Sequence, residues 1–332
     1  MLIQGGYAIY ARTPARGRAL TEIGLGTSLF GNLYRETTDE EVRAAADRAW
    51  RGGVRYFDTA PHYGLGLAEQ RLGSLLRGHP RGEYVVSTKV GRILVPTPEN
   101  ARLRDDDGFA VPAAYRREWD FSRDGVLRSV DASLARLGLD SVEILYLHDP
   151  DEHWDAASTT GVDALIELRE QGVVQAIGAG MNRSSMLAEF VRRADVDIVM
   201  LAGRYTLLDQ SALDDLLPLA LERGVSVVAA GVYNSGLLSR PDVSDDAHFD
   251  YGAAPREMIE QARRIAAVCR DHGVTLPDAA VQFPLRHPAI VSAVLGARDG
   301  GQMADGLERY AVHIPDELWV ELEDAGLVKP TA

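Results

Sequence analysis

The chain has 332 residues, 46% of them hydrophobic, and its formal net charge of −14 argues against nucleic acid or an anionic membrane as a partner, because both bind basic surfaces. Its single cysteine, Cys269, excludes an internal disulfide and a cysteine-based zinc site, and no apolar run reaches the ~18 residues of a membrane-spanning helix. We therefore expect a cytoplasmic protein with a large core that binds a small molecule and no metal ion; the composition leaves its oligomeric state open.

Short β-rich runs alternate with amphipathic segments along the chain, a pattern typical of repeated strand–helix units with a parallel sheet. We predict eight strands, at Ile23–Ser28, Arg55–Asp58, Tyr84–Lys89, Val142–Leu147, Val174–Ala179, Ile198–Leu201, Val225–Ala230 and Ile290–Leu295. We predict helices between them, at Asp39–Arg51, Leu67–Leu76, Arg123–Leu137, Val162–Gln171, Ser184–Arg193, Ser211–Arg223 and Pro255–His272. A doubly wound sheet would normally carry a GxGxxG phosphate loop after its first strand, and the segment Gly24-Leu-Gly-Thr27 does not continue in that way. A (β/α)8 TIM barrel, as one domain over residues 1–332, is the better prediction.

Two long segments interrupt this pattern. Residues 91–119 follow the third predicted strand, and residues 231–254 follow the seventh. Loops of this length are uncommon in compact domains and often form lids over a substrate. We expect both to lie over the face at which the strands end.

Titratable side chains stand at the ends of three predicted strands. Asp58 ends the second strand and Tyr63 follows five residues later, Lys89 ends the third strand, and His148 follows the fourth. The carboxyl ends of the strands of a parallel barrel converge on one face, so we expect these four side chains to meet and to carry out proton transfer. Taken singly, Asp58 is equally typical of a turn, His148 of a core, and Lys89 of the Schiff-base lysine of a lyase.

The motif Gly53-Val-Arg-Tyr-Phe-Asp-Thr-Ala-Pro-His-Tyr-Gly64, with Leu25-Gly-Thr27, the Lys89 segment and His148, resembles the aldo-keto reductase family. The resemblance covers nearly the whole chain. It implies a (β/α)8 barrel that binds a nicotinamide cofactor, NAD or NADP, in extended form without a Rossmann domain. It also implies an oxidoreductase with a catalytic tetrad of Tyr63, Lys89, Asp58 and His148.

The chemistry of hydride transfer accounts for these four residue types. Proton transfer at the substrate oxygen must accompany the hydride, and we expect Tyr63 to carry it out. The Lys89 ammonium is expected to lower the pKa of the Tyr63 phenol, and Asp58 to keep Lys89 protonated. His148 is expected to orient the substrate oxygen or relay its proton.

The resemblance also indicates where the cofactor binds. This chain has small residues where many family members have serine, glutamine and tyrosine after the fifth, sixth and seventh strands: Gly180, Ala202 and Ala230. We expect Asn182 to replace the serine, and glycines after the seventh strand to let backbone N–H groups approach the pyrophosphate. The full set of predicted cofactor-binding residues is Gly26, Thr27, Asn182, Gly231, Asn234, Gly236, Gly296, Arg298 and Gln302.

The same resemblance bears on the choice between NAD and NADP. A 2′-phosphate needs cationic partners, and Arg298 is one candidate. Asp299 would repel a phosphate, and the family's lysine and second arginine positions hold Gly296 and Gln302. We predict NAD, or use of both cofactors.

Several segments are similar to the aldose 1-dehydrogenases of this family, with the pyridoxal 4-dehydrogenases close by: Leu147–Trp154, Ala176–Asn182, Leu201–Leu208 and Gly231–Leu237. This similarity implies that a sugar of the L-fucose or D-threo-aldose type is oxidised at its anomeric carbon to a lactone. We expect His62, Trp154 and Tyr251 to bind the sugar, because aromatic planes suit its apolar face and polar groups its hydroxyls. The alternatives are an NADPH-dependent general aldehyde or ketone reductase, a pyridoxal 4-dehydrogenase and, outside enzymes, a nicotinamide-binding regulatory subunit.

Overall fold

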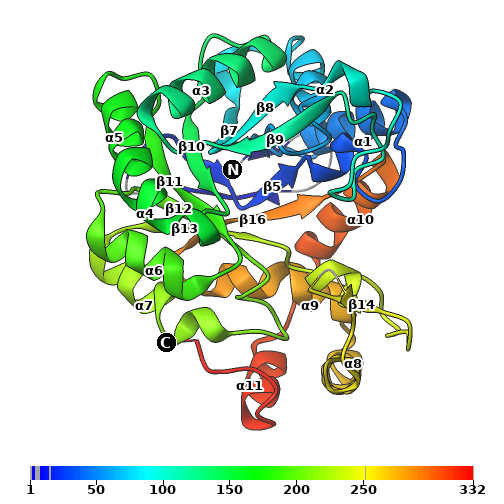
Figure 1. Ribbon diagram of the computed structural model, residues 1–332. Coiled ribbons are helices and arrows are strands. Elements are labelled where there is room, and N and C mark those ends of the chain that lie inside the picture. The colour runs from blue at the N-terminus through cyan, green and yellow to red at the C-terminus, as the bar shows by residue number, and fades with distance from the viewer. Residues whose placement is uncertain (1, 4–7, 15, 251, 332) are drawn as a thin grey trace.

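The computed structural model describes residues 2–3, 8–14, 16–250 and 252–331, and its centre is a closed barrel of parallel strands (Figure 1). In order around the barrel the strands are β5 (Ile23–Gly26), β6 (Tyr56–Asp58), β7 (Val85–Val90), β10 (Ile144–His148), β11 (Ala176–Met181), β12 (Ile198–Ala202), β13 (Ser226–Ala230) and β16 (Ile290–Gly296). The predicted barrel is therefore confirmed. All eight predicted strands are present, with ends that differ from the prediction by at most two residues.

Helices surround the barrel and cover its outer surface (Figure 1). Those that the sequence predicted are α1 (Asp39–Arg51), α2 (Leu67–Leu76), α3 (Arg123–Leu137), α5 (Val162–Glu170), α6 (Ser184–Arg193), α7 (Leu216–Arg223) and α8 (Arg256–Asp271). The helix predicted at Ser211–Arg223 is wrong at its start, because Ser211–Leu213 forms a separate 3-10 turn and the Asp215 side chain accepts a hydrogen bond from the first N–H of α7. No helix among the described residues is long and apolar enough to cross a membrane.

The structure adds elements that the sequence did not predict. These are the helices α4 (Trp154–Ala156), α9 (Leu276–Gln282), α10 (Gly300–Ala311) and α11 (Asp316–Asp324), and the short strand pairs β1 (Leu2–Ile3) with β2 (Ala8–Ile9) and β3 (Ala11–Arg12) with β4 (Leu20–Thr21). The pair β3–β4 lies at the amino-terminal end of the barrel. There Leu20 is fully buried against the apolar side chains inside the barrel, and Ser292 of β16 donates a hydrogen bond to the carbonyl of Thr21.

Apolar side chains fill two layers, one inside the barrel and one between the strands and the helices. Barrel strands are buried on both faces, which explains why their sequences read as nearly continuous apolar runs. Tyr56, Tyr146 and Met200 lie in the inner layer, and Phe57, Leu145 and Leu147 face the helices. The filled interior leaves only the rims of the barrel for a binding site.

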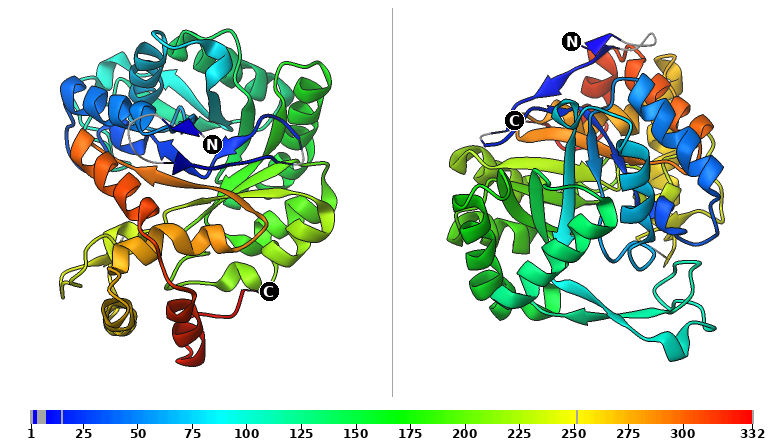
Figure 2. Two further views of the ribbon diagram at one scale, coloured as in Figure 1. Left: turned by 180° about the vertical axis from the view of Figure 1, so that it is seen from behind. Right: turned by 90° about the horizontal axis from the view of Figure 1, so that it is seen from above.

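The two long segments after β7 and β13 contain strand pairs of their own. Residues 91–119 include the antiparallel pair β8 (Arg92–Pro96) and β9 (Tyr115–Trp119), in which Arg92 lies opposite Trp119. Residues 231–254 include the short pair β14 (His248–Phe249) and β15 (Gly252–Ala253). The β8–β9 pair lies on the opposite face of the barrel from the amino terminus (Figure 2, right). It therefore stands at the face on which the barrel strands end.

Helices α2 and α3 approach each other closely at Gly73, where an added Cβ would lie 1.9 Å from the carbonyl oxygen of Leu137. We expect Gly73→Ala to lower the free energy of unfolding by roughly 1–3 kcal/mol, because the two helix backbones must separate. Urea unfolding followed by circular dichroism measures this. Gly78→Ala is the matched control, since a Cβ there meets nothing within 4 Å, and an equal loss in both variants would contradict the explanation.

Candidate active site

The four predicted catalytic residues come from neighbouring strands and one turn at the carboxyl rim of the barrel. Asp58 ends β6, Lys89 lies in β7, His148 ends β10, and Tyr63 lies in the turn between β6 and α2. The register pairs Asp58 with Ser87, and Lys89 with Tyr146. The structure therefore brings the four side chains to one place, as predicted; their catalytic role stays a prediction.

A buried ion pair joins the first two of these residues. Lys89 Nζ lies 2.6 Å from Asp58 Oδ2, and the side chains are only 2% and 4% exposed. The ammonium also donates to the carbonyl of Thr59 at 3.0 Å and to the Tyr63 hydroxyl at 3.2 Å, while Ser87 donates to Asp58 Oδ1 at 2.7 Å. Burial alone would lower the pKa of Lys89, but Asp58, and next Tyr63, outweigh it and raise that pKa above its ordinary value. A Schiff-base lysine needs a lowered pKa, so this environment argues against the lyase alternative.

Lys89 is also unusual in the chain as a whole, which has two lysines. The second, Lys329, lies far along the sequence, with its side chain 49% exposed and its ammonium 2.6 Å from Asp214 Oδ1. Arginine supplies every other basic side chain except histidine. Of the two lysines in the chain, the one beside Tyr63 is therefore the buried one.

The Tyr63 phenol differs from expectation in its pKa. Burial raises that pKa above the ordinary value for a phenol, and the Lys89 ammonium opposes this effect without overcoming it. Lys89 thus lowers that pKa as predicted, but the loss of water around the phenolate, which the prediction did not count, outweighs its effect. Lys89 still favours the phenolate relative to a site that lacks it.

His148 lies beside Tyr63, with the two rings perpendicular and their centroids 5.8 Å apart. Burial, and next the positive charges of Arg92 and Lys89, lower the pKa of His148 well below its usual value, so the ring is neutral. Its Nε2 lies 3.5 Å from Asp149 Oδ2, and its Nδ1 is buried without a hydrogen-bond partner. The carboxylate favours the tautomer with the proton on Nε2, ready to donate to an oxygen.

Two further ion pairs lie next to His148. Arg92 Nη2 is 2.5 Å from Asp149 Oδ2, and Arg117 of β9 contacts Asp105 through both carboxylate oxygens, at 2.6 and 3.1 Å. Sequence reasoning missed all four of these residues. Arg92 and Arg117 lie in the long segment after β7, where periodicity gave no indication of which side chains turn inward.

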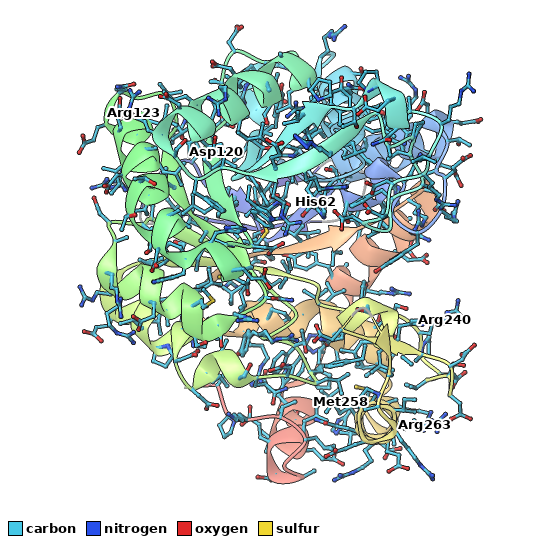
Figure 3. All side chains as sticks on the ribbon, viewed as in Figure 1. His62, Asp120, Arg123, Arg240, Met258 and Arg263 are labelled. Atoms are coloured by element: carbon cyan, nitrogen blue, oxygen red, sulfur yellow. The ribbon has the colours of Figure 1, made fainter. Side chains whose placement is uncertain are left out.

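His62 lies between the two arginines and beside the β8–β9 pair (Figure 3). Arg117 Nε donates to His62 Nδ1 at 2.6 Å, and Arg92 Nη1 is 3.3 Å from both ring nitrogens. An arginine has no acceptor, so Nδ1 carries no proton and the ring is the Nε2–H tautomer. Burial and the charges of Arg92 and Arg117 lower the pKa of His62 to about 2. The structure thus places this predicted substrate residue beside the tetrad as a neutral side chain.

A cavity of about 550 Å³ opens beside these groups at the ends of β10, β11 and β12. Its lining is mainly polar and consists of Asp149, Asp151, Asn182, Arg183, Ser184, Ser185, Arg204, Ser211 and Asp250. Arg204 closes one side, because it donates to the Asn182 carbonyl at 3.1 Å and to the Asp250 carboxylate at 2.9 Å. The cavity therefore runs from Asp149, next to His148, to the segment after β13.

The sequence profile described as the aldo/keto reductase family matches residues 22–326. This chain belongs to the aldo/keto reductase family. It is similar to a D-threo-aldose 1-dehydrogenase from a Pseudomonas species, with 47% identity over 317 residues, which cover 95% of this chain and 96% of that protein. It is also similar to a pyridoxal 4-dehydrogenase from Microbacterium luteolum, with 39% identity over 331 residues, 94% of this chain and 96% of that protein. The solved holo form of an aldo-keto reductase from Bacillus halodurans shares the fold with a TM-score of 0.75 over 98% of each chain, at 24% identity.

The family assignment confirms an oxidoreductase and implies a nicotinamide cofactor, and the rim of this aldo-keto reductase fits one. A Cβ at Gly180 would lie 3.4 Å from Met200 Cβ and 3.8 Å from Lys89 Cε, so there is room for a side chain where none is present. Asn234 is buried at φ 45°, donates to the Gly203 carbonyl at 3.2 Å, and leaves its Oδ1 buried without a partner. The absence of a side chain at Gly180 beside Lys89 and an unused buried acceptor at Asn234 suit a planar amide ligand.

The other predicted cofactor residues of this aldo-keto reductase lie around the same rim. Gly26 ends β5, and the Thr27 hydroxyl donates to the Asp58 carbonyl at 3.0 Å. Gly231 and Gly236 have φ of 64° and 100°, a conformation that glycine adopts readily. Asn182 lines the cavity, and Gly296 ends β16.

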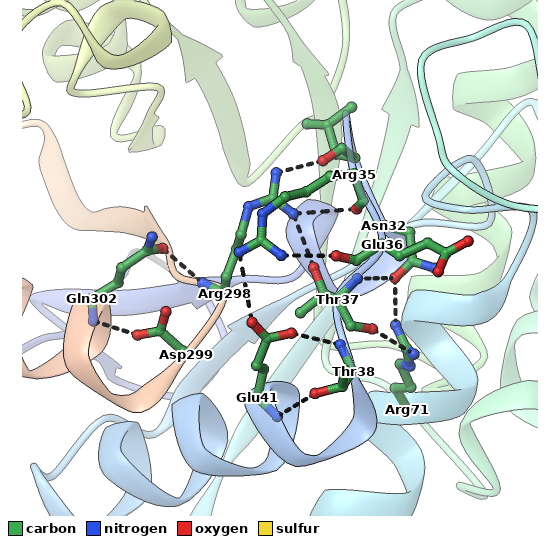
Figure 4. Close-up of polar contacts among 11 residues, drawn as sticks. Asn32, Arg35, Glu36, Thr37, Thr38, Glu41, Arg71, Arg298, Asp299 and Gln302 are labelled. Carbon is green, nitrogen blue, oxygen red and sulfur yellow. Dashed lines mark hydrogen bonds and ion pairs between the residues drawn. The ribbon is translucent and has the colours of Figure 1, made fainter.

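Arg298 is fixed by contacts within the protein (Figure 4). Its guanidinium donates to the Thr37 hydroxyl at 2.9 Å and to the Leu33 carbonyl, and the residue is only 8% exposed. The Gln302 side chain accepts from the Arg298 backbone N–H at 2.9 Å, and Asp299 caps α10 by accepting from the Gln302 backbone N–H at 2.9 Å. These side chains connect the segment before α1 to the start of α10.

The predicted substrate residues differ in their outcome. His62 lies at the site, but Trp154 of α4 packs against Phe190 of α6, with ring centroids 4.8 Å apart. Tyr251 lies outside the described residues. An exposed aromatic ring among the described residues is that of Trp119, which is 41% exposed and packs on the Arg92 guanidinium. The sequence showed Trp119 only as part of a long loop.

The two arginines at His62 lead to a prediction about its charge. Because its pKa is lowered to about 2, we expect the His62 ring to stay neutral as the pH falls from about 8 to about 5, where an ordinary histidine gains a proton. Nitrogen-15 NMR of histidine-labelled protein measures this, and His62→Gln identifies the signal by removing it. A His62 signal that titrates near pH 6.5 would show that the arginines do not approach the ring in solution.

Proposed function

We propose that this aldo-keto reductase oxidises an aldose of the L-fucose or D-threo-aldose type at its anomeric carbon, giving a lactone, with NAD or NADP as the cofactor. The observation that carries the proposal is the polar cavity that begins at Asp149, whose carboxylate lies 3.5 Å from His148 Nε2, with the Tyr63 ring on His148 in turn. Carboxylate, amide and hydroxyl groups match the hydroxyls of a sugar. The relative at 47% identity is named for oxidation of such a sugar.

Tyr63 is the group that receives the proton in this proposal. As the anomeric hydroxyl becomes a carbonyl, its proton passes to the Tyr63 oxygen, and a bound nicotinamide supplies the acceptor for the hydride that leaves the carbon. Lys89 Nζ, 3.2 Å from the phenol oxygen, stabilises the negative charge that Tyr63 needs in order to accept a proton. Asp58 keeps that ammonium charged, and His148 donates from Nε2 to the substrate oxygen.

For the cofactor we favour NAD over NADP. The Arg298 guanidinium already donates to Thr37 and Leu33, so it is not free for a 2′-phosphate. Asp299 adds a negative charge at the start of α10, where a phosphate would otherwise benefit from the helix amino terminus. Both features support a cofactor that carries a 2′-hydroxyl.

Pyridoxal oxidation is the second candidate, because a relative with 39% identity is named a pyridoxal 4-dehydrogenase. The aromatic ring of pyridoxal would favour an apolar or aromatic wall. Among the residues that the structure describes, which do not include Tyr251, none that lines the cavity is aromatic. The polar groups of the lining support an aldose, whereas the Trp119 ring over Arg92 would suit either compound.

Cofactor reduction tests the proposal directly. We expect the wild-type protein to reduce NAD, and NADP less efficiently, with L-fucose, D-arabinose, L-galactose or L-xylose, and to prefer these to D-glucose and pyridoxal. Tyr63→Phe should lower kcat by about 10²–10⁴-fold with cofactor affinity retained, because the proton acceptor is lost. Activity with pyridoxal alone, or only NADPH-dependent reduction of simple aldehydes, would refute the aldose proposal. Cofactor binding without turnover of any of these compounds would indicate a regulatory subunit.

The pH dependence tests the role of Lys89. The rate of oxidation should rise with pH into the alkaline range, because burial raises the pKa of Tyr63 and the phenolate is the form that accepts the proton. Lys89→Met removes the opposing positive charge, so the rise should move to higher pH by roughly one to three units. Lys89→Arg keeps the charge and should move it less. A pH profile of kcat that is the same in the wild type and in Lys89→Met would show that Lys89 does not act on the phenol.

A further inference from the structure

Three ion pairs stand in a row at the rim, and they differ in how open they are. The pairs Asp58–Lys89 and Asp105–Arg117 are closed, with side chains at most 10% exposed. In the third pair, Arg92–Asp149, the Asp149 side chain is 37% exposed and lines the cavity. A carboxylate held in place on one side and open on the other is suited to accept hydrogen bonds from a ligand.

The backbone at Asp149 is held in a conformation that few residues adopt. Asp149 has φ 41° and is followed by Pro150, and its N–H donates to the Gly180 carbonyl at 3.0 Å, next to the last pair of the β10–β11 ladder. Left-handed backbone is uncommon at residues other than glycine, and aspartate and asparagine adopt it more readily than most. Here it places Asp149 Oδ2 3.5 Å from His148 Nε2. This backbone conformation thus holds a carboxylate beside the group that would contact the reacting oxygen.

The base of the β8–β9 pair completes this arrangement. Arg92 and Trp119 lie opposite each other in the ladder, and the Arg92 guanidinium lies 4.5 Å from the centre of the Trp119 ring. Arg92 Nε is buried and has no hydrogen-bond partner, while Trp119 keeps 41% of its surface exposed. The Arg92 guanidinium thus connects Asp149 to a partly exposed aromatic ring, which also contacts His153 with ring centroids 4.8 Å apart.

We propose that Asp149 and Arg92 recognise the substrate hydroxyl on the carbon next to the reacting carbon, while Trp119 packs against the apolar face of the sugar ring. This assignment rests on the proposed function. Tyr63 and His148 would contact the oxygen of the anomeric carbon. The hydroxyl oxygen on the neighbouring carbon lies about one hydrogen-bond length from that oxygen, a separation similar to that between Asp149 Oδ2 and His148 Nε2. Asp149 accepts the proton of that hydroxyl in a hydrogen bond, and Arg92 donates to its oxygen. These three residues therefore determine specificity and do not take part in the proton transfer.

The test compares L-fucose with 2-deoxy-L-fucose, which lacks that hydroxyl. We expect the wild-type kcat/KM to be about 10- to 100-fold higher for L-fucose, and Asp149→Asn to remove most of this ratio by lowering the value for L-fucose alone. Asparagine tolerates left-handed backbone, so the variant keeps the local fold. The ratio within one preparation does not depend on the fraction of folded enzyme, so partial misfolding does not obscure the result.

Glu118 and Arg116 of β9, on the strand pair that also carries Arg92 and Trp119, provide matched controls. Glu118→Gln makes the same kind of change at a side chain that is 47% exposed and paired with Arg116, and it should leave the ratio unchanged. Arg92→Lys should reduce the ratio, because a lysine lacks the planar fork of arginine. Arg116→Lys makes the same change at an exposed residue and should leave the ratio unchanged.

The outcomes separate the inference from the function on which it rests. If wild-type protein oxidises L-fucose and Asp149→Asn lowers kcat/KM equally for both sugars, or abolishes both, Asp149 acts through His148 and the specificity assignment is overturned. If the wild type shows no preference for L-fucose over its 2-deoxy analogue, the assignment is also overturned. If the wild type oxidises neither these sugars nor any other aldose tested, the proposed function fails first, and the inference fails with it.

Discussion

The pairing of β16 with β5 closes the sheet into a barrel, and this closure determines where every functional group lies. An open sheet would leave β5 and β16 as edges and spread the strand ends along a line. The pairing of β6 with β7 and of β7 with β10 brings Asp58, Lys89 and His148 to neighbouring strand ends, although they are up to 90 residues apart in sequence, and closure of the barrel curves these ends around one opening. Apolar side chains fill the interior of the barrel, with Leu20 at its amino-terminal end. The chemistry is thereby confined to the carboxyl rim.

The buried ion pairs at this rim influence the protonation of neighbouring side chains and contribute little to the free energy of unfolding. Removing two charges from water costs several kcal/mol per ion, and apolar residues of similar size often give equal or greater stability. The pairs Asp58–Lys89 and Asp105–Arg117 are nonetheless kept almost fully buried. In return, each cation stays charged next to a group whose protonation matters: Lys89 next to Tyr63, and Arg117 next to His62. Burial and charge oppose each other at Tyr63, and act together at His62.

The sequence predicted those parts of the molecule that depend on regular spacing. Strand ends carry Asp58, Lys89 and His148 to the rim because strand periodicity and barrel geometry place them there. Side chains in irregular segments could not be placed in this way: Trp154 was assigned to the substrate and packs on Phe190, whereas the exposed Trp119 ring packs on the Arg92 guanidinium. Helix α9 lies between α8 and β16, where alternation of strand and helix requires one helix only, and α10 and α11 follow β16, the last of the predicted strands. The pKa of Tyr63 depends on burial in three dimensions, which spacing along the chain does not supply.

The scarcity of lysine has a consequence for a protein that handles carbonyl compounds. Free amines condense with the open-chain aldehyde of a sugar to form Schiff bases, and slow glycation of surface lysines follows. Of the two side-chain amines here, Lys89 is buried and held protonated by Asp58, and Lys329 is paired with Asp214. Arginine, whose guanidinium is a far weaker nucleophile, supplies the remaining positive surface charge apart from histidine. The chain therefore offers sugar aldehydes few lysine side chains to modify, and the lysine closest to the proposed chemistry is the better protected of the two.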